Sequence, residues 1–317
     1  AMKKFKFNNS ELSDEKIKIC AIINVTPDSF SDGGDYNSVD EALNRAKEFY
    51  KHGINFFDIG GESTRPHSDF VETGDEINRI VPVIKKIKEE IPDSIISVDT
   101  WKSDVAKAAI EAGADIINDI TGFLGDPNMA SVISNSDVGY ILMFNPTIIR
   151  PEHKDSKKFP KFSPDTLGYE DSMPFSESEI KEYRDKDILD LLNIYLDKSL
   201  EIAKSYNIGK DRIMLDPGIG FGLTYDENLK LLKNIDLIKS RDCFTFLGVS
   251  RKRFLMDIVD KLGFESDIKK AEGLNNSDLA SAILTSYATI NDIDVIRVHS
   301  LKEHLVSSQI ITKIKNA

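Results

Sequence analysis

Residues 17–34 read IKICAIINVTPDSFSDGG, and this stretch indicates the fold of the whole chain. Its first part, residues 17–23, is apolar apart from Lys18, which is typical of a β-strand buried on both faces. The apolar run ends at Asn24 and continues into polar and turn-forming residues that close with a Gly-Gly pair. α/β proteins build ligand sites where buried strands end in such side chains. We therefore expect an α/β fold with a site at its strand ends.

The same unit repeats along the chain. Strand patterns alternate with amphipathic helix patterns between residues 17 and 315. The predicted strands lie at 17–23, 54–58, 94–98, 115–118, 138–143, 212–215, 244–248 and 293–297. The predicted helices lie near 39–52, 75–90, 102–112, 186–206, 226–240, 275–290 and 300–315, with a short one near 127–134. Eight strands alternating with helices fit a single (β/α)8 TIM barrel better than an open doubly wound sheet.

Two segments stand outside this repeat. Residues 1–16 are predicted to form an N-terminal extension, and residues 17–317 the barrel domain. Residues 146–185, a long insertion after the fifth strand, are rich in proline and charge and show no sustained period. A connection of this length in a compact domain is either functional or mobile. We interpret it as a solvated surface insertion.

Composition limits the classes of partner. A chain of 317 residues with 40% hydrophobic residues can bury a large core, and no stretch is long and apolar enough to cross a membrane. The net charge of −12 argues against a nucleic-acid partner, which would require a basic face. Lys3, Lys4 and Lys6 precede a polar run, so we expect no secretory signal peptide.

The two cysteines indicate the compartment. Cys20 falls in the predicted first strand and Cys243 at the start of the seventh, and these strands are not neighbours in a closed eight-stranded barrel. We therefore expect both to be reduced core residues of a cytoplasmic protein.

Polar side chains follow the predicted strands where they end. The second strand ends at Asp58 and runs into GGESTRP at residues 60–66, in which Arg65 offers a planar cation for a carboxylate or phosphate. A solvated turn with an incidental arginine is the alternative. The seventh strand is followed by Ser250 and then by consecutive cations that include Lys252, although such a run is usually a solvated basic turn.

Acidic and amide groups end three further strands. Asp99, Asn118 and Asp216 would therefore lie at the barrel mouth, where a carboxylate can accept two parallel hydrogen bonds from an N–H next to an NH2 group. Each could instead cap a helix N-terminus. We prefer capping for Asp119 and disfavour it for Asp216, because Pro217 and three glycines follow before any helix.

The eighth strand ends in Arg297-Val298-His299. Alternation along a strand points Arg297 and His299 the same way, so the two could bind one anion together opposite Asn24 on the neighbouring first strand. Either residue alone would more often be structural.

Together these segments resemble the dihydropteroate synthase family. The matching motifs are residues 24–34, 60–66, 97–100, 117–119, 216–222, 250–252 and 297–299. They occur in the family's order and span nearly the whole chain, which makes the set far more specific than any one motif.

The resemblance implies a fold and a reaction. The fold is a (β/α)8 barrel, and the reaction condenses p-aminobenzoate with 6-hydroxymethyl-7,8-dihydropterin diphosphate to give 7,8-dihydropteroate and pyrophosphate. It implies a cytoplasmic homodimer that is a target of sulfonamides, with small-molecule substrates and no nucleic-acid or membrane partner. Loops 25–38 and 59–73 would close over the reactants and exclude water.

The resemblance also assigns residues by matching position. The pterin would be held by Asp99, Asn118, Asp216 and Lys252, with Met143 packing on it. The p-aminobenzoate site would be lined by Thr64, Arg65, Pro66, Phe221 and Ser250. The catalytic residues would be Asn24, Lys252, Arg297 and His299, with Mg2+ at Asn24 and the diphosphate on Asn24, Arg297 and His299. Arg297, His299 and Mg2+ could stabilise charge on the leaving diphosphate.

One position departs from the family's pattern. After the fifth strand the family commonly shows Met-His, whereas this chain has Met143-Phe144 followed by the long insertion.

Two alternatives compete with the synthase. Methyltetrahydrofolate-dependent methyltransferases share the pterin-holding residues but need no grip on a diphosphate. A non-catalytic, pterin-binding paralogue would lack a required residue, and none is missing.

Overall fold

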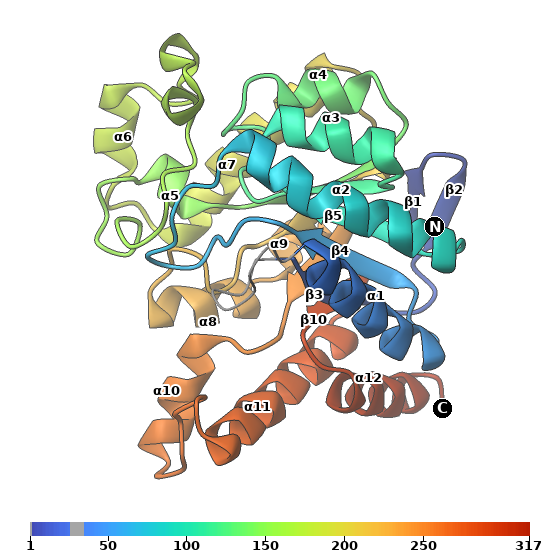
Figure 1. The fold of residues 1–317 in the computed structure, drawn as a ribbon. Coiled ribbons are helices and arrows are strands. Elements are labelled where there is room, and N and C mark those ends of the chain that lie inside the picture. Colours follow the sequence, from blue (N-terminus) through green and yellow to red (C-terminus); the bar gives the residue numbers. More distant parts are fainter. Residues whose placement is uncertain (1, 26–34) are drawn as a thin grey trace.

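A closed barrel of eight parallel strands forms the centre of the protein (Figure 1). The computed structural model describes residues 2–25 and 35–317, and in residues 35–37 the backbone only. The strands are β3 (Lys18–Asn24), β4 (Phe56–Gly60), β5 (Ile95–Asp99), β6 (Ile116–Asp119), β7 (Gly139–Met143), β8 (Ile213–Asp216), β9 (Phe244–Gly248) and β10 (Val295–Val298). Neighbouring strands follow chain order, and β10 pairs with β3 to close the ring. The predicted TIM barrel is confirmed by this strand order, and its strands are mostly apolar and buried.

Helices surround the barrel and cover the outer faces of its strands (Figure 1). They are α1 (Asp35–Lys51), α2 (Thr73–Glu90), α3 (Ser103–Ala112), α4 (Met129–Ser134), α7 (Ile188–Ser205), α8 (Tyr225–Lys233), α9 (Asp236–Lys239), α10 (Arg253–Lys261), α11 (Ala271–Ile290) and α12 (Lys302–Lys315). The helix predicted at 226–240 is divided into α8 and α9, and α10 was not predicted. The polar pair at Lys233-Asn234 falls at that division, where α8 ends.

The N-terminal extension forms a hairpin that plugs one end of the barrel. Strands β1 (Lys4–Phe7) and β2 (Ser10–Ser13) pair antiparallel. Phe5 is fully buried, with its ring 5.7 Å from that of Phe244 at the start of β9. A Cβ at Gly139, the first residue of β7, would lie 2.3 Å from the Phe5 ring, so glycine makes room for the plug. The alternation in KFKF is the sequence signal for β1, which was not among the predicted strands.

The insertion is packed against the barrel at its base, residues 146–150, whereas more than half of residues 151–185 are exposed, as expected of a solvated segment. It contains α5 (Pro146–Ile149), the 3-10 turns η1 (Pro164–Leu167) and η2 (Glu170–Ser172), and α6 (Glu177–Tyr183). The buried Arg150 donates to both carboxylate oxygens of Glu227, at 2.8 and 2.7 Å, and to the carbonyl oxygen of Gly222 at 2.9 Å. A charge at this depth requires such pairing, so the insertion is fixed to the start of α8.

The cysteines lie in the core. Cys20 on β3 and Cys243 just before β9 are buried and free, and β10 separates their strands. Among the described residues, no helix is both long and apolar enough to cross a membrane.

Candidate active site

The predicted site residues meet at one mouth of the barrel. Parallel strands place their carboxyl ends at the same edge, and backbone register aligns Gly60 with Asp99, Asp99 with Asn118, and Met143 with Asp216. Asn24 is exposed at the end of β3 and pairs with Gly60. Residues 26–34, which complete the first motif, lie outside the described residues.

Asp58 is the centre of the polar network at this mouth. It is fully buried on β4 and accepts hydrogen bonds from Ser97 Oγ at 2.6 Å, Asn118 Nδ2 at 3.2 Å and Arg297 Nε at 2.6 Å. The sequence pattern indicates Asp58 only as the end of a strand. A carboxylate inside the apolar sequence FFDIG must be paired, and that was the available signal.

Arg297 lies between two carboxylates. Its Nη2 atom is 3.8 Å from Asp99 Oδ2, and Asp58 holds the Nε side of the guanidinium. Burial opposes the charge of Arg297, but the two carboxylates outweigh this effect and raise its pKa. The guanidinium is therefore fixed in position and permanently charged.

Asp99 is the carboxyl group with an open hydrogen-bonding capacity. Its Oδ1 atom is buried and has no hydrogen-bond partner among the described residues. Burial, together with the charge of Asp58, raises its pKa to about 8, and Arg297 opposes this shift. A buried polar atom without a partner is costly, so this oxygen is available to a ligand donor.

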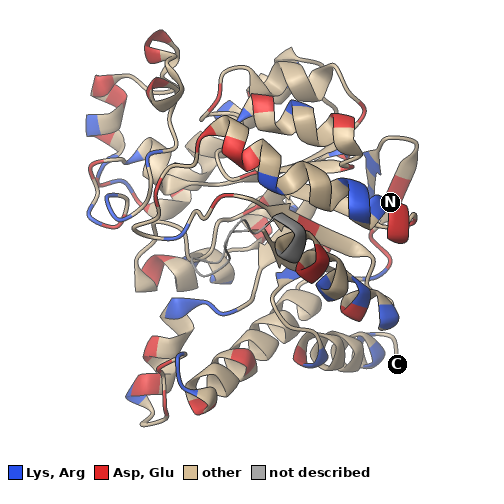
Figure 2. Ribbon diagram, in the orientation of Figure 1, with Lys and Arg blue, Asp and Glu red and all other residues tan. Residues whose placement is uncertain are grey.

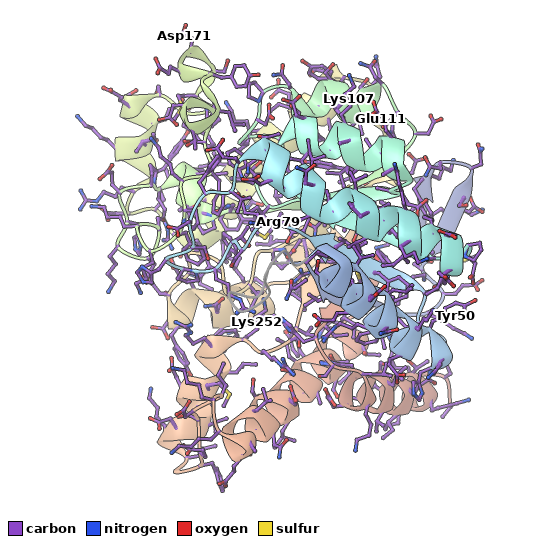
Figure 3. All side chains as sticks on the ribbon, viewed as in Figure 1. Tyr50, Arg79, Lys107, Glu111, Asp171 and Lys252 are labelled. Atoms are coloured by element: carbon purple, nitrogen blue, oxygen red, sulfur yellow. The ribbon has the colours of Figure 1, made fainter. Side chains whose placement is uncertain are left out.

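Asp216 and Lys252 form a second acid–base pair. Burial raises the pKa of Asp216 to about 6 and lowers that of Lys252 to about 8, and each charge partly offsets the shift of the other. Asp216 Oδ1 accepts from the backbone N–H of Gly218 at 2.9 Å, so one oxygen caps a turn while the other is left for a ligand. Lys252, labelled in Figure 3, donates to the carbonyl oxygen of Ile219 at 2.9 Å.

The glycines after β8 allow the backbone to pass close to its neighbours. Gly218 has a φ of +73°, and a Cβ there would lie 2.1 Å from the carbonyl oxygen of Phe144. Only glycine fits this conformation and this contact, which explains the glycine-rich sequence.

His299 is held by Ser250. Its ring Nδ1 lies 2.9 Å from Ser250 Oγ, and its backbone N–H donates to the same oxygen at 3.0 Å. Burial and the positive charge of Arg297 lower the His299 pKa to about 2. His299 is therefore neutral near pH 7. Arg45 on α1 donates to the carbonyl oxygens of His299 and Ile22, joining the ends of β10 and β3.

The loop after β4 carries the next predicted group. Thr64 and Pro66 are half-buried and Arg65 is exposed. This loop is anchored by Glu62, which accepts from Trp101 Nε1 at 3.1 Å and from the backbone N–H of Val71 at 2.8 Å.

A buried lysine supports that anchor. Lys102 Nζ lies 2.9 Å from Glu62 Oε2 and 2.9 Å from Glu76 Oε1. Arg79, labelled in Figure 3, donates to the carbonyl oxygen of Gly61 at 2.7 Å. None of these anchoring residues was predicted, because their roles depend on contacts between distant segments.

The remaining predicted residues are Met143 and Phe221. Met143 is buried at the end of β7, beside Asp216. Phe221 is half-buried in the segment after β8, and its ring packs on rings of the insertion. Asp216 at the end of β8 and Phe221 in the segment after it therefore lie at the same mouth of the barrel as Met143.

The comparisons with known proteins decide the family. The family described as pterin-binding enzymes matches residues 20–299. A dihydropteroate synthase of Bacillus subtilis is 37% identical over 289 residues, covering 91% of this chain and 85% of the relative. One of Streptococcus pyogenes serotype M6 is 36% identical over 285 residues, covering 90% of each chain. The chain belongs to the dihydropteroate synthase family.

Solved structures of dihydropteroate synthases share the fold. The Clostridium difficile enzyme, solved in the presence of pteroic acid, superposes with a TM-score of 0.74 at 32% identity, covering 96% of this chain and 98% of that one. A Xanthomonas albilineans dihydropteroate synthase with 4-aminobenzoic acid matches the fold with a TM-score of 0.79 at 24% identity over both full lengths. Membership of the dihydropteroate synthase family makes the chain a transferase of folate biosynthesis.

Phe144, where the sequence departs from the Met-His pattern expected of the family, packs in the core. It is fully buried, and its backbone N–H donates to the carbonyl oxygen of Asp216 at 2.8 Å. Its ring packs edge-on against Tyr195 at 5.2 Å. Phe144 therefore fills the core beneath the mouth and extends the apolar packing between β7 and α7.

Proposed function

We propose that this protein condenses p-aminobenzoate with 6-hydroxymethyl-7,8-dihydropterin diphosphate, releasing pyrophosphate and 7,8-dihydropteroate. The bond between the methylene carbon and the diphosphate oxygen breaks, and its electron pair leaves with the diphosphate. The aniline nitrogen forms the new bond to carbon and loses a proton. The observation that carries the proposal is the set of buried acceptors at the mouth, above all the unpartnered Oδ1 of Asp99.

The acceptor set suits a pterin. The pterin ring presents an N–H beside an NH2 group, and a carboxylate oxygen pair accepts both. Asp216 is ionised at neutral pH for most of the time, because its pKa is raised only to about 6. Asn118 donates its amide N–H to Asp58, which orients the amide and leaves its carbonyl oxygen as an acceptor.

The diphosphate would lie where β10 and β3 end. Asp58 orients the Arg297 guanidinium from its Nε side, and His299 offers a neutral imidazole beside it. Preorganised donors of this kind stabilise charge as it develops on a leaving group.

We assign Mg2+ to Asn24 together with the diphosphate. The described residues contain no cluster of three His, Cys, Asp or Glu side chains that could hold a metal. Mg2+ accepts a site of this kind, because it commonly keeps several waters and binds one or two protein oxygens plus substrate phosphates. The exposed amide oxygen of Asn24 fits that role, and the bound ion would neutralise negative charge on the diphosphate.

We also propose that two copies associate through α11 and α12. Apolar side chains on these helices are more than half exposed: Leu279, Ile283, Ile290, Val306, Ile310 and Ile314. The two helices pack together and are largely uncharged along their middle parts (Figure 2). Several exposed apolar side chains on two paired helices favour an interaction surface, and such a surface suits the self-matching contact of a two-fold dimer. Sedimentation equilibrium should show a dimer that Ile283→Glu converts to a monomer, while a monomeric parent would refute the assignment.

The remaining expectations concern the cellular compartment, the class of partner and inhibition by sulfonamides. The two buried, free cysteines support a cytoplasmic enzyme, and the net charge of −12 argues against a nucleic-acid partner. An arylamine site of the proposed kind is also one that sulfonamides, as arylamine analogues, would occupy.

The decisive experiment measures pyrophosphate release. Purified protein is given the pterin diphosphate and Mg2+, with and without p-aminobenzoate, and dihydropteroate is identified by mass. Stoichiometric release that depends on p-aminobenzoate is the expected result. Absence of product would refute the proposal, and methyl transfer from methyltetrahydrofolate would favour the competing class of pterin enzyme.

A further inference from the structure

The insertion supplies aromatic rings to Phe221. The ring of Phe159 lies 4.5 Å from that of Phe221 between centroids, tilted by 32°, and the ring of Phe162 lies 5.9 Å from it. Phe162 is buried, while Phe159 and Phe221 are half-buried. Aromatic contacts at these distances fix ring orientation as well as burying area.

The insertion is fixed next to this cluster on the barrel side. Arg150, which is 2% exposed, donates to the carbonyl oxygen of Gly222, the residue after Phe221. The same guanidinium binds Glu227 through two nitrogens. The base of the insertion therefore holds the backbone that carries Phe221, and the rings hold its side chain.

The insertion also contacts the opposite loop. The carbonyl oxygen of Lys158 accepts from the backbone N–H of His67 at 2.7 Å. The ring of Phe162 meets Trp101 at 5.9 Å, nearly perpendicular to it, and Trp101 donates to Glu62. In Figure 1 the loop after β4 runs toward the insertion, which includes α5 and α6. The insertion thus connects the segment of Phe221 with the loop of Thr64–Pro66.

We infer that the insertion builds one wall of the arylamine side of the active site, with Phe159 and Phe162 as positioning residues that act through Phe221. The inference rests on the proposed function, because that proposal assigns Phe221 and the loop of Thr64–Pro66 to p-aminobenzoate. A flat aromatic ring is the ligand that a preset Phe221 would select. The acceptors that would hold the pterin contact neither Phe159 nor Phe162 in the described interactions.

Phe159→Ala and Phe162→Ala test the inference by separating the two substrates. KM for p-aminobenzoate should rise about 3- to 10-fold, the scale of a lost aromatic contact, while kcat and KM for the pterin diphosphate stay within about 2-fold. Phe159→Tyr keeps the aromatic ring, so this variant should show the parent KM for p-aminobenzoate. Phe159 is half-buried, so its variant remains informative where Phe162→Ala fails to fold.

Phe175→Ala is the matched control within the same insertion. Phe175 is buried against Tyr183, with ring centroids 5.9 Å apart, and makes no described contact with Phe221. Its loss should lower the melting temperature and leave KM for p-aminobenzoate unchanged. If Phe159→Ala is folded and active and keeps the parent KM for p-aminobenzoate, this inference is overturned and the proposed function stands. The same holds if KM rises equally in Phe175→Ala. An inactive parent protein would overturn the proposed function and this inference together.

Discussion

Replacing Asp58 by asparagine tests the buried network directly. The asparagine oxygen can still accept from Arg297 and Asn118, and its amide N–H can face Ser97, whose hydroxyl can accept. The hydrogen-bond count is thus nearly preserved, and the main loss is one negative charge 2.6 Å from Arg297 Nε. Asp99, 3.8 Å from Nη2, remains as the nearest described carboxylate.

The expected loss of stability is about 3 kcal/mol. Removing one partner of a buried ion pair costs about 3–5 kcal/mol, because the other charge stays desolvated. A unit charge pair near 4 Å at an effective dielectric of about 20 interacts by about 4 kcal/mol, which gives the same scale. Asp99 reduces the cost, because loss of the Asp58 charge lowers its pKa and lets it ionise beside Arg297. These effects place Asp58→Asn at the lower end of the range.

Urea unfolding followed by circular dichroism measures this difference, and Asp197→Asn is its control. Asp197 pairs with Arg241 at 2.6 Å, the same separation, but its side chain is 71% exposed, so its loss should change stability by at most about 1 kcal/mol. If Asp58→Asn and Asp197→Asn are equally stable, with the same denaturant dependence as the parent, burial is not what gives the Asp58 pair its strength.

Four further predictions follow from the same site. Asp216→Asn should keep the fold and weaken pterin binding by about 10-fold or more in calorimetry, since a donor would face the ring's donors at a cost of about 1–3 kcal/mol. The Asp99 pKa is raised from 3.8 to about 8, so its contribution to stability falls as pH rises through that window, and Asp99→Asn should remove this decline in urea titrations. Lys102→Met removes the cationic partner of Glu62 and Glu76 and should speed hydrogen exchange across 61–72. Chelating Mg2+ with EDTA should lower pyrophosphate release by ~10²-fold, restored by added Mg2+, with binding of an uncharged pterin unchanged.

Much of the barrel and the location of its mouth could be predicted from sequence. A strand buried on both faces leaves an uninterrupted apolar run, and a polar residue such as Asp99 or Asp216 marks where it ends. Because a parallel barrel puts all carboxyl ends at one edge, residues far apart in sequence could be placed together before any contact was known.

The pairing within the site could not be predicted in this way. Asp58 lies inside a strand, and which cation would meet it depends on the register of β4 against distant strands. The anchoring role of Arg150 likewise arises from a segment without periodicity, where a charged residue reads as solvated until its partner Glu227 is known. Sequence patterns report the exposure of a strand or helix face, whereas these residues depend on single contacts between segments.

The charge balance at the mouth supports a divalent cation more strongly than the formal charges of the residues suggest. Arg297 is matched by Asp58 at 2.6 Å, and the charge of Lys252 is offset by that of Asp216. From the sequence alone, His299 could be counted as a cation. Its pKa is lowered to about 2, so it stays neutral. A diphosphate entering this mouth therefore meets little unmatched positive charge at the strand ends, and the exposed Arg65 of the loop after β4 is the exception. In a site of low dielectric, a diphosphate without a balancing positive charge is costly to bind. A cation that arrives with the substrate would supply that positive charge.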